Sequence, residues 1–404
     1  MQFNTIYINN INKQIDQSIV DAISTYSKFN ISETSGSIPT VDVELQSLGI
    51  NNPYIILNGP CEWFESWSDS RINFDANTEV YFFLYEVLSV WHNHSRYNCP
   101  EGIIDKDCSI NEFDMIKAWC NKHNCKFKIF TNEYQIKDAL RKTQYANWAI
   151  YPLDTFSLGY CHLNKKQTKW SPTEFKYKVA CFTYRWDQHR HHAISFLYNT
   201  FGNDAIMTHY HETSNVAYKY SFTKSKHWQT LVNGRNALVN VVPLSVEKGP
   251  IKAVNMREYI NPAVDQINNI GENTSDNIED YYFNSFLTLA CETNYEYPWG
   301  QISEKVLDPM KQGSAILLLA GPGSLQLLKH WGLKTFNDFW NEDYDNETDP
   351  IKRMDKVFDI LTDIKNQSKK ELQEIKKHMQ PILVHNRNHI RTGAIRKEIT
   401  KVLS

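Results

Sequence analysis

The stretch from Phe286 to Lys305, FLTLACETNYEYPWGQISEK, gathers residue types that suit an anionic ligand. A strand-like apolar run leads into a polar and aromatic loop, and the loop leads into a helix start at Glu304 and Lys305. Helix N-termini that follow buried strands hold phosphates in many α/β proteins, because their first backbone amides are unpaired. Lys305 adds a positive charge, and Glu292 and Glu304 flank the loop. The stretch therefore predicts a ligand with a diphosphate and hydroxyls, such as a nucleotide sugar.

The same residues have a structural alternative. Ser303 and Glu304 could cap a helix and complement its dipole. Glu292 could bind a ribose or order the loop, and Tyr295 could stack on a base or sugar or simply pack. Without further information the pattern leaves both interpretations open.

A second loop has residues that suit a phosphate. In KVACFTYRWDQHRHHAISFL, residues 178–197, a strand-like run precedes a short loop and a helix. Arg190 at the helix start is the candidate for the diphosphate, because its planar fork makes paired hydrogen bonds to phosphate oxygens. Arg185 is its rival in the same loop. The neighbouring histidines, His189, His191 and His192, are expected at the phosphate end of the site.

These segments resemble the donor-binding region of the α-1,3-fucosyltransferases, glycosyltransferase family 10. The resemblance lies in the strand 286–290, in C-E-T at 291–293 and in I-S-E-K at 302–305. Farther on, G-L-K-T-F-N-D-F at 332–339, followed by Glu342, Tyr344 and Asp345, is similar to a stretch of related microbial and viral glycosyltransferases. The resemblance extends roughly over residues 178–388, with gaps.

The resemblance implies an α/β fold of the GT-B type, with two Rossmann-like domains facing a cleft. It implies an inverting transferase that moves a sugar, fucose from GDP-fucose, to a hydroxyl acceptor. Arg190 and Lys305 would hold the diphosphate and Glu304 would contact the sugar. The rest of the donor site would comprise Arg185, Glu292, Tyr295 and Ser303. Such enzymes use no metal and no cofactor, because positive side chains stabilise the leaving group.

The general base is predicted at Glu86. The run EVYFFLYEVLS at 79–89 resembles the acceptor-domain strand of the same family. A carboxylate at the end of a strand can take the acceptor proton if partial burial raises its pKa toward neutrality. Glu62 and Glu65 are alternatives.

Strand and helix patterns alternate in both halves of the chain, which predicts parallel sheets. We expect an acceptor domain at 1–165 and a donor domain at 176–404, joined by a polar linker at 163–176 and ending in an amphipathic helix at 355–379. The predicted strands are 54–57, 80–85, 126–131, 147–151, 178–183, 237–242, 286–290 and 315–319. The predicted helices include 112–121, 133–143, 192–200, 276–282, 303–312 and 324–331.

Composition limits the functional classes. A chain of 404 residues accommodates two domains. A net charge of -3 makes nucleic acid an unexpected partner, although a local basic patch stays compatible with it. No signal peptide and no 18-residue apolar run is evident, so we expect no membrane anchor and a cytoplasmic enzyme, in the host cytoplasm if the source is a virus.

Two rival functions stay open. One is a glycosyltransferase that uses another nucleotide sugar on a glycan, a protein or a modified nucleic acid. The other is a carbohydrate-binding module without catalysis. For a transferase the expected partners are a nucleotide sugar and a glycan or other hydroxyl acceptor, whereas the binding module would bind a glycan without a nucleotide sugar.

Overall fold

The computed structural model describes two parts of the chain. In the first half, the described residues are 4–7, 54–58, 79–84, 117–131 except 119, 123 and 125, and 146–152. In the second half they are 173–208 except 184–186, 222–238, 281–395 except 294 and 297–299, and 398. Two compact units result, one of residues 1–165 with 396–404 and one of residues 166–395. Within the described ranges, no helix is long and apolar enough to cross a membrane.

Unit 1 contains a five-stranded parallel sheet with the strand order β1-β2-β3-β4-β5. The strands are β1 (Asn4–Tyr7), β2 (Tyr54–Asn58), β3 (Glu79–Leu84), β4 (Lys126–Thr131) and β5 (Ile150–Pro152). The predictions for β2, β3 and β4 agree with these bounds to within a residue. Strand β5 begins three residues later than predicted, and β1 was not predicted. Glu86, Glu62, Glu65 and the predicted helix at 133–143 lie outside the described residues.

Unit 2 contains a four-stranded parallel sheet with the order β7-β6-β8-β9. Its strands are β6 (Tyr177–Phe182), β7 (Ala205–Thr208), β8 (Ser285–Cys291) and β9 (Ala315–Leu319). Every residue of β8 and β9 is buried, as expected for parallel strands covered on both faces. The predicted strand at 237–242 is wrong at its start, because 237 and 238 belong to a helix; the rest of that prediction lies outside the described residues.

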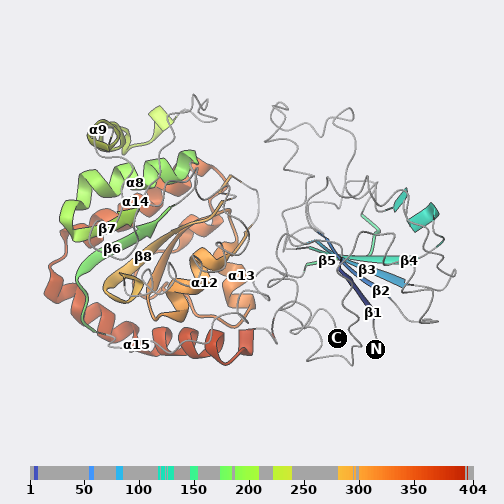
Figure 1. Ribbon diagram of the computed structural model, residues 1–404. Helices are drawn as coiled ribbons and strands as arrows, with labels where there is room; N and C mark the ends of the chain where they lie inside the picture. The colour runs from blue at the N-terminus through green and yellow to red at the C-terminus, as the bar shows by residue number, and fades with distance from the viewer. Residues whose placement is uncertain are drawn as a thin grey trace, which may run out of the picture. The chain divides into compact units, whose positions relative to one another are not determined.

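The α-helices of unit 2 with described bounds are α8 (Gln188–Phe201), α9 (Trp228–Leu238), α12 (Glu304–Lys311), α13 (Ser324–His330), α14 (Pro350–Asn366) and α15 (Lys369–Arg391). Short 3-10 turns occupy 202–204, 222–224 and 343–346. Phe196 of α8 stacks on Phe358 of α14 with ring centroids 4.2 Å apart. Figure 1 shows the sheet lying between the pair α8 and α14 and the pair α12 and α15.

Two polar features fix the ends of the last helices. Lys178 of β6 donates from Nζ to the carbonyls of Lys365 and Gln367, at 2.8 and 2.7 Å, and so satisfies the end of α14. Ser368 and Glu371 then form a capping box that starts α15. The prediction of a single amphipathic helix at 355–379 is therefore wrong, because α14 ends and α15 begins at this cap.

The predicted linker also needs correction at its end. Phe175 is buried and packs against Phe286, with ring centroids 5.6 Å apart. Residues 173–176 therefore belong to unit 2, and β6 follows immediately. The α/β class and the presence of two Rossmann-like parallel sheets are confirmed.

The strand order of unit 2 creates a switch point. From β6 the chain passes through α8 to β7 on one side, whereas β8 lies on the other side of β6. Open parallel sheets bind ligands beyond the carboxyl ends of strands where the order reverses. For the described strands, that point lies between β6 and β8. The start of α8 and the loop that begins at Glu292 both follow this edge.

Candidate anion site at the β6–β8 switch point

Glu292 joins the end of β8 to the start of α12. Its carboxylate is buried and accepts two hydrogen bonds from Ser303, from the backbone N–H at 2.7 Å and from Oγ at 2.6 Å. Burial raises the pKa of Glu292, while the nearby Lys305 and the Ser303 bonds oppose that rise. Of the two roles foreseen for Glu292, the geometry favours ordering of the loop, because Ser303 occupies both carboxylate oxygens.

Arg190 lies in the first turn of α8 and is 2% exposed. Its Nη1 pairs with Asp187 at 2.7 Å, and its Nη2 donates to Thr293 Oγ1 at 2.8 Å. Among the described residues, its Nε has no hydrogen-bond partner. The side chain of the N-cap residue Asp187 makes no capping hydrogen bond to α8.

Lys305 lies in the first turn of α12 and is 30% exposed. Its Nζ pairs with Glu304 at 2.5 Å and donates to Ser303 Oγ at 3.4 Å. Ser303 caps the helix by accepting the backbone N–H of Lys305 at 3.3 Å. Glu304 is similarly exposed, so both charged groups of this pair are accessible to a ligand.

One chain of contacts joins the two cations. Arg190 contacts Thr293, the neighbouring Glu292 holds Ser303, and Ser303 contacts Lys305. The structure thus brings together five predicted site residues, Arg190, Glu292, Ser303, Glu304 and Lys305, at the edge where strand order reverses. Each cation is paired with a carboxylate of its own helix start. An incoming anion must therefore displace Asp187 from Arg190 or Glu304 from Lys305.

Two histidines beside Arg190, His189 and His192, do not add positive charge. His189 is buried, its Nε2 lies 2.7 Å from the carbonyl of Glu292, and its pKa falls well below the usual value because of burial and the adjacent Arg190. Burial lowers the pKa of His192 to about 3. Both rings are therefore neutral at pH 7.

Tyr295 is packed within the unit. Its ring stacks on His189 with centroids 4.8 Å apart, the Arg353 guanidinium lies 4.5 Å from its centre, and it is 1% exposed. Its hydroxyl donates to the carbonyl of Pro350, and its own carbonyl accepts from Arg353. This geometry disfavours stacking of Tyr295 on a base or a sugar and favours its role in holding the loop against α14.

Gly300 fixes the approach of the loop to α12. A Cβ at this position would lie 2.5 Å from the Ser324 nitrogen and 2.6 Å from the carbonyl carbon of Gly323. The next residue, Gln301, donates its backbone N–H to Ser324 Oγ at 3.2 Å. The loop therefore rests directly on the turn that starts α13, and this contact sets where α12 begins.

The stretch that contains Glu342 and Asp345 has a structural role. Asp345 accepts the backbone N–H groups of Leu325 and Gln326, at 3.0 and 3.3 Å, and so caps α13. Glu342 accepts the N–H of Phe336 at 2.7 Å. These acidic residues stabilise turns, which explains their spacing without assigning them to catalysis.

Two predicted site residues, Arg185 and Glu86, lie outside the described residues. Asp187 and Thr293 were missed as site residues. The spacing of Asp187 and Arg190 at i and i+3 could have indicated their pairing, whereas no local signal links Thr293 to Arg190. Within the described residues, no group of three potential ligands could hold a metal ion.

Comparisons with known proteins give limited similarity. No protein-family model matches the chain, and no curated protein matches it. Structures of T4 phage β-glucosyltransferase are similar over the full chain. The complex with UDP and Mn²⁺ has 13% identity, covers 100% of both chains and has a TM-score of 0.45. The DNA modifying enzyme β-glucosyltransferase, with and without uridine diphosphoglucose, has 13% identity, covers 100% of this chain and 99% of that one, and has a TM-score of 0.48. Similarities at this level carry no argument about chemistry.

Proposed function

We propose that the chain is a glycosyltransferase that binds the diphosphate of a nucleotide sugar at the β6–β8 switch point. The observation that carries the proposal is the contact chain between Arg190 and Lys305 through Thr293, Glu292 and Ser303. Two cations from two separate helix starts can contact both phosphates of one ligand.

The carboxylates of the site suit the sugar end of such a ligand. When phosphate takes Lys305, Glu304 is released to accept hydrogen bonds from sugar hydroxyls and to favour positive charge at the anomeric carbon. The resemblance of residues 286–305 to the family 10 fucosyltransferases supports this assignment and makes GDP-fucose the first donor to test.

The proposed reaction is an inverting displacement. The acceptor hydroxyl oxygen attacks the anomeric carbon, the bond from that carbon to the phosphate oxygen breaks, and the nucleoside diphosphate leaves between Arg190 and Lys305. Glu86 is the proposed base that takes the acceptor proton. Arg190 and Lys305 supply the charge stabilisation that a divalent ion supplies elsewhere, so the proposed reaction is independent of metal.

The direct test is donor-dependent stabilisation. GDP, GDP-fucose, UDP, UDP-glucose and inorganic phosphate would be added separately to wild-type protein and to Lys305→Ala. A ligand at 100 times its Kd stabilises the native state by about 2.7 kcal/mol. For a unit of 150–250 residues, each kcal/mol of stabilisation raises Tm by roughly 2–4 °C. We expect stabilisation by one nucleoside diphosphate in the wild type and its loss in the variant. Equal stabilisation of both proteins by every ligand would remove the proposed site.

Turnover is measured with the donor that stabilises best, with and without EDTA. The acceptor panel contains glycans, a hydroxyl-bearing peptide and DNA with hydroxyl-bearing bases, since the acceptor class is open. We expect transfer that EDTA does not reduce and a product of opposite anomeric configuration by NMR. Glycan binding without any donor-dependent stabilisation or transfer would favour the non-catalytic alternative.

A further inference from the structure

A cavity lies in unit 2, separate from the anion site. It has a volume of about 360 Å³, within the range of roughly 300–1,000 Å³ typical of small-molecule pockets. Its walls come from α14, the first turns of α15, residues 339–344 and Phe286 of β8. Arg190, Glu292, Ser303 and Lys305 do not line it. A ligand in this cavity would therefore bind without the diphosphate residues.

Trp340 forms one wall of the cavity. One face of its ring stacks on Phe336, with centroids 5.3 Å apart and an interplanar angle of 28°. Trp340 lines the cavity, whereas Phe336 does not. The wall thus offers an aromatic surface to a ligand.

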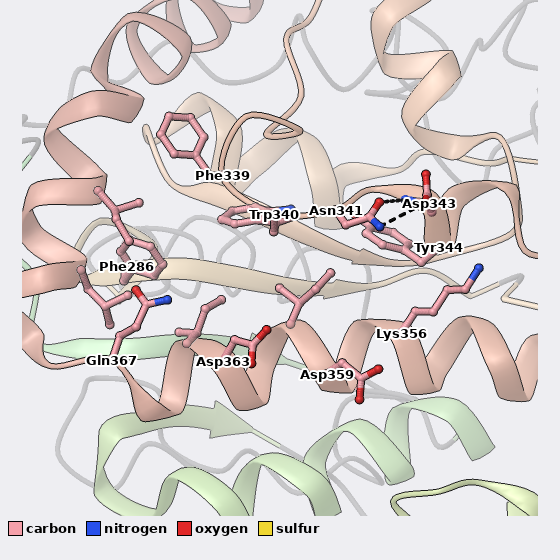
Figure 2. A pocket seen from close by; sticks show the side chains of 14 residues that line it. Phe286, Phe339, Trp340, Asn341, Asp343, Tyr344, Lys356, Asp359, Asp363 and Gln367 are labelled. Carbon is pink, nitrogen blue, oxygen red and sulfur yellow. Dashed lines mark hydrogen bonds between the residues drawn. The ribbon is translucent and has the colours of Figure 1, made fainter.

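The facing wall is a polar stripe of α14. Asp359 and Asp363 lie four residues apart on one face of α14, and Gln367 follows at the C-cap of the helix, opposite Trp340 and Asn341 (Figure 2). Asp359 is already paired with Lys226 and with His227. In the part of the chain that the structure describes, Asp363 makes no hydrogen bond or ion pair, and Gln367 Oε1 is buried without a partner.

Apolar side chains complete the cavity. Ile360 and Ile364 lie between the polar positions of α14, and Phe286 and Leu372 belong to the same lining. The cavity therefore combines an apolar interior, an aromatic platform and a small number of polar groups. Phosphate is an unsuitable ligand, because Asp363 would repel it and Lys356, the cation among the lining residues, is paired with Glu347 at 3.2 Å.

We propose that this cavity is a saccharide-binding site. A pyranose ring has an apolar C–H face that fits against Trp340 and hydroxyls at its edge that each donate and accept. The exposed Asp363 carboxylate accepts those hydroxyl protons. A polycation fits less well, because Asp359 is paired with Lys226 and Asp343 is held by Asn341 at 3.0 Å, which leaves one uncommitted carboxylate.

The test uses saturation-transfer NMR on the full chain with L-fucose, lactose, maltose and cellobiose as separate probes and spermidine as a cationic probe. We expect transfer to the ring C–H protons of at least one saccharide. Trp340→Ala should weaken that binding by roughly tenfold, and Asp363→Ala by roughly fivefold, since each removes one main contact. Lys305→Ala should leave saccharide binding unchanged, which separates this site from the proposed donor site.

Asp363 is exposed and uncommitted among the described residues, so Asp363→Ala should fold normally and decides the question if Trp340→Ala is unstable. Absence of transfer to all four saccharides overturns the proposal. So does saccharide binding that Asp363→Ala leaves at wild-type strength, and so does Asp363-dependent binding of spermidine alone.

Discussion

Both carboxylate oxygens of Glu292 accept hydrogen bonds from Ser303, which lies eleven positions farther along the chain. Glu292 directly follows the last residue of β8, and Ser303 is the N-cap of α12. This contact and the packing of Gly300 on the start of α13 together hold the start of α12 at the sheet edge. The position of Lys305 depends on both contacts.

Replacing Glu292 with Gln should destabilise unit 2 by about 1–3 kcal/mol, because an amide N–H₂ would face a Ser303 donor in a buried site. Urea unfolding followed by fluorescence measures the change in free energy. Glu374→Gln is the matched control, because Glu374 is exposed and pairs with Lys377 on the surface of α15. The control should stay within about 0.5 kcal/mol of wild type. Equal effects of both substitutions would contradict the structural role of Glu292.

Arg190→Lys should weaken binding of the stabilising nucleoside diphosphate by roughly tenfold or more, because a lysine cannot reproduce the fork that contacts Asp187 and Thr293 together. Titration calorimetry measures the affinity. Arg235→Lys, on the exposed side of α9, serves as the control and should bind normally. Retention of wild-type affinity in Arg190→Lys would show that the guanidinium geometry is irrelevant to the ligand.

Two glycine substitutions should separate stability from binding. In Gly300→Ala the new Cβ meets backbone atoms at 2.5–2.7 Å, and in Gly234→Ala it meets the Ser195 carbonyl oxygen at 1.9 Å. Both should cost about 1–3 kcal/mol or more through overpacking. Gly300→Ala should also reduce ligand affinity per folded molecule, because it moves the start of α12. Gly234→Ala affects the contact of α9 with α8. Unchanged affinity in Gly300→Ala would disprove the coupling.

Lys376 should make stability rise with pH. It is buried on α15, its Nζ donates to the Ser285 carbonyl at 2.7 Å, and burial lowers its pKa to about 7. From pH 7 to about 10, the unfolded chain holds more protons at this lysine than the folded chain does. This group therefore adds stability as pH increases, by at most about 1.4 kcal/mol per unit.

The measurement is urea unfolding at several pH values between 7 and 9.5 for wild type and Lys376→Met. Other groups titrate equally in both proteins, so their difference isolates Lys376. The free energy of unfolding of the wild type should rise relative to the variant as pH increases. Parallel profiles would mean that Lys376 keeps its ordinary pKa.

The strands of both sheets were largely predictable because buried parallel strands are continuous apolar runs, as in β8 and β9. Strand β7 was missed because it has four residues, AIMT, and follows α8 after only a 3-10 turn. The break between α14 and α15 was also missed, although Ser368 and Glu371 carry the spacing of a capping box. In that case the periodicity of the surrounding helices concealed a local signal.

The site was predictable in its cations and less so in its contacts. Arg190 and Lys305 follow from helix starts after apolar strands, which sequence reveals. The contact between Arg190 and Thr293 spans 103 residues, so it depends on the strand order β6-β8, which local pattern does not determine. The wrong start of the strand at 237–242 has a similar cause, because packing of α9 against α8 extends the helix over those residues.

The thiols of Cys181 and Cys291 lie 4.0 Å apart on the adjacent strands β6 and β8, and both are buried. Burial and the neighbouring thiol raise the pKa of Cys181 well above its usual value, so it is a poor nucleophile while the sheet is intact. An alkylating reagent should reach this pair when the two strands separate. The rate at which the two thiols are alkylated can be followed from the masses of their peptides. That rate would report how often the sheet opens beneath the anion site, with no added label.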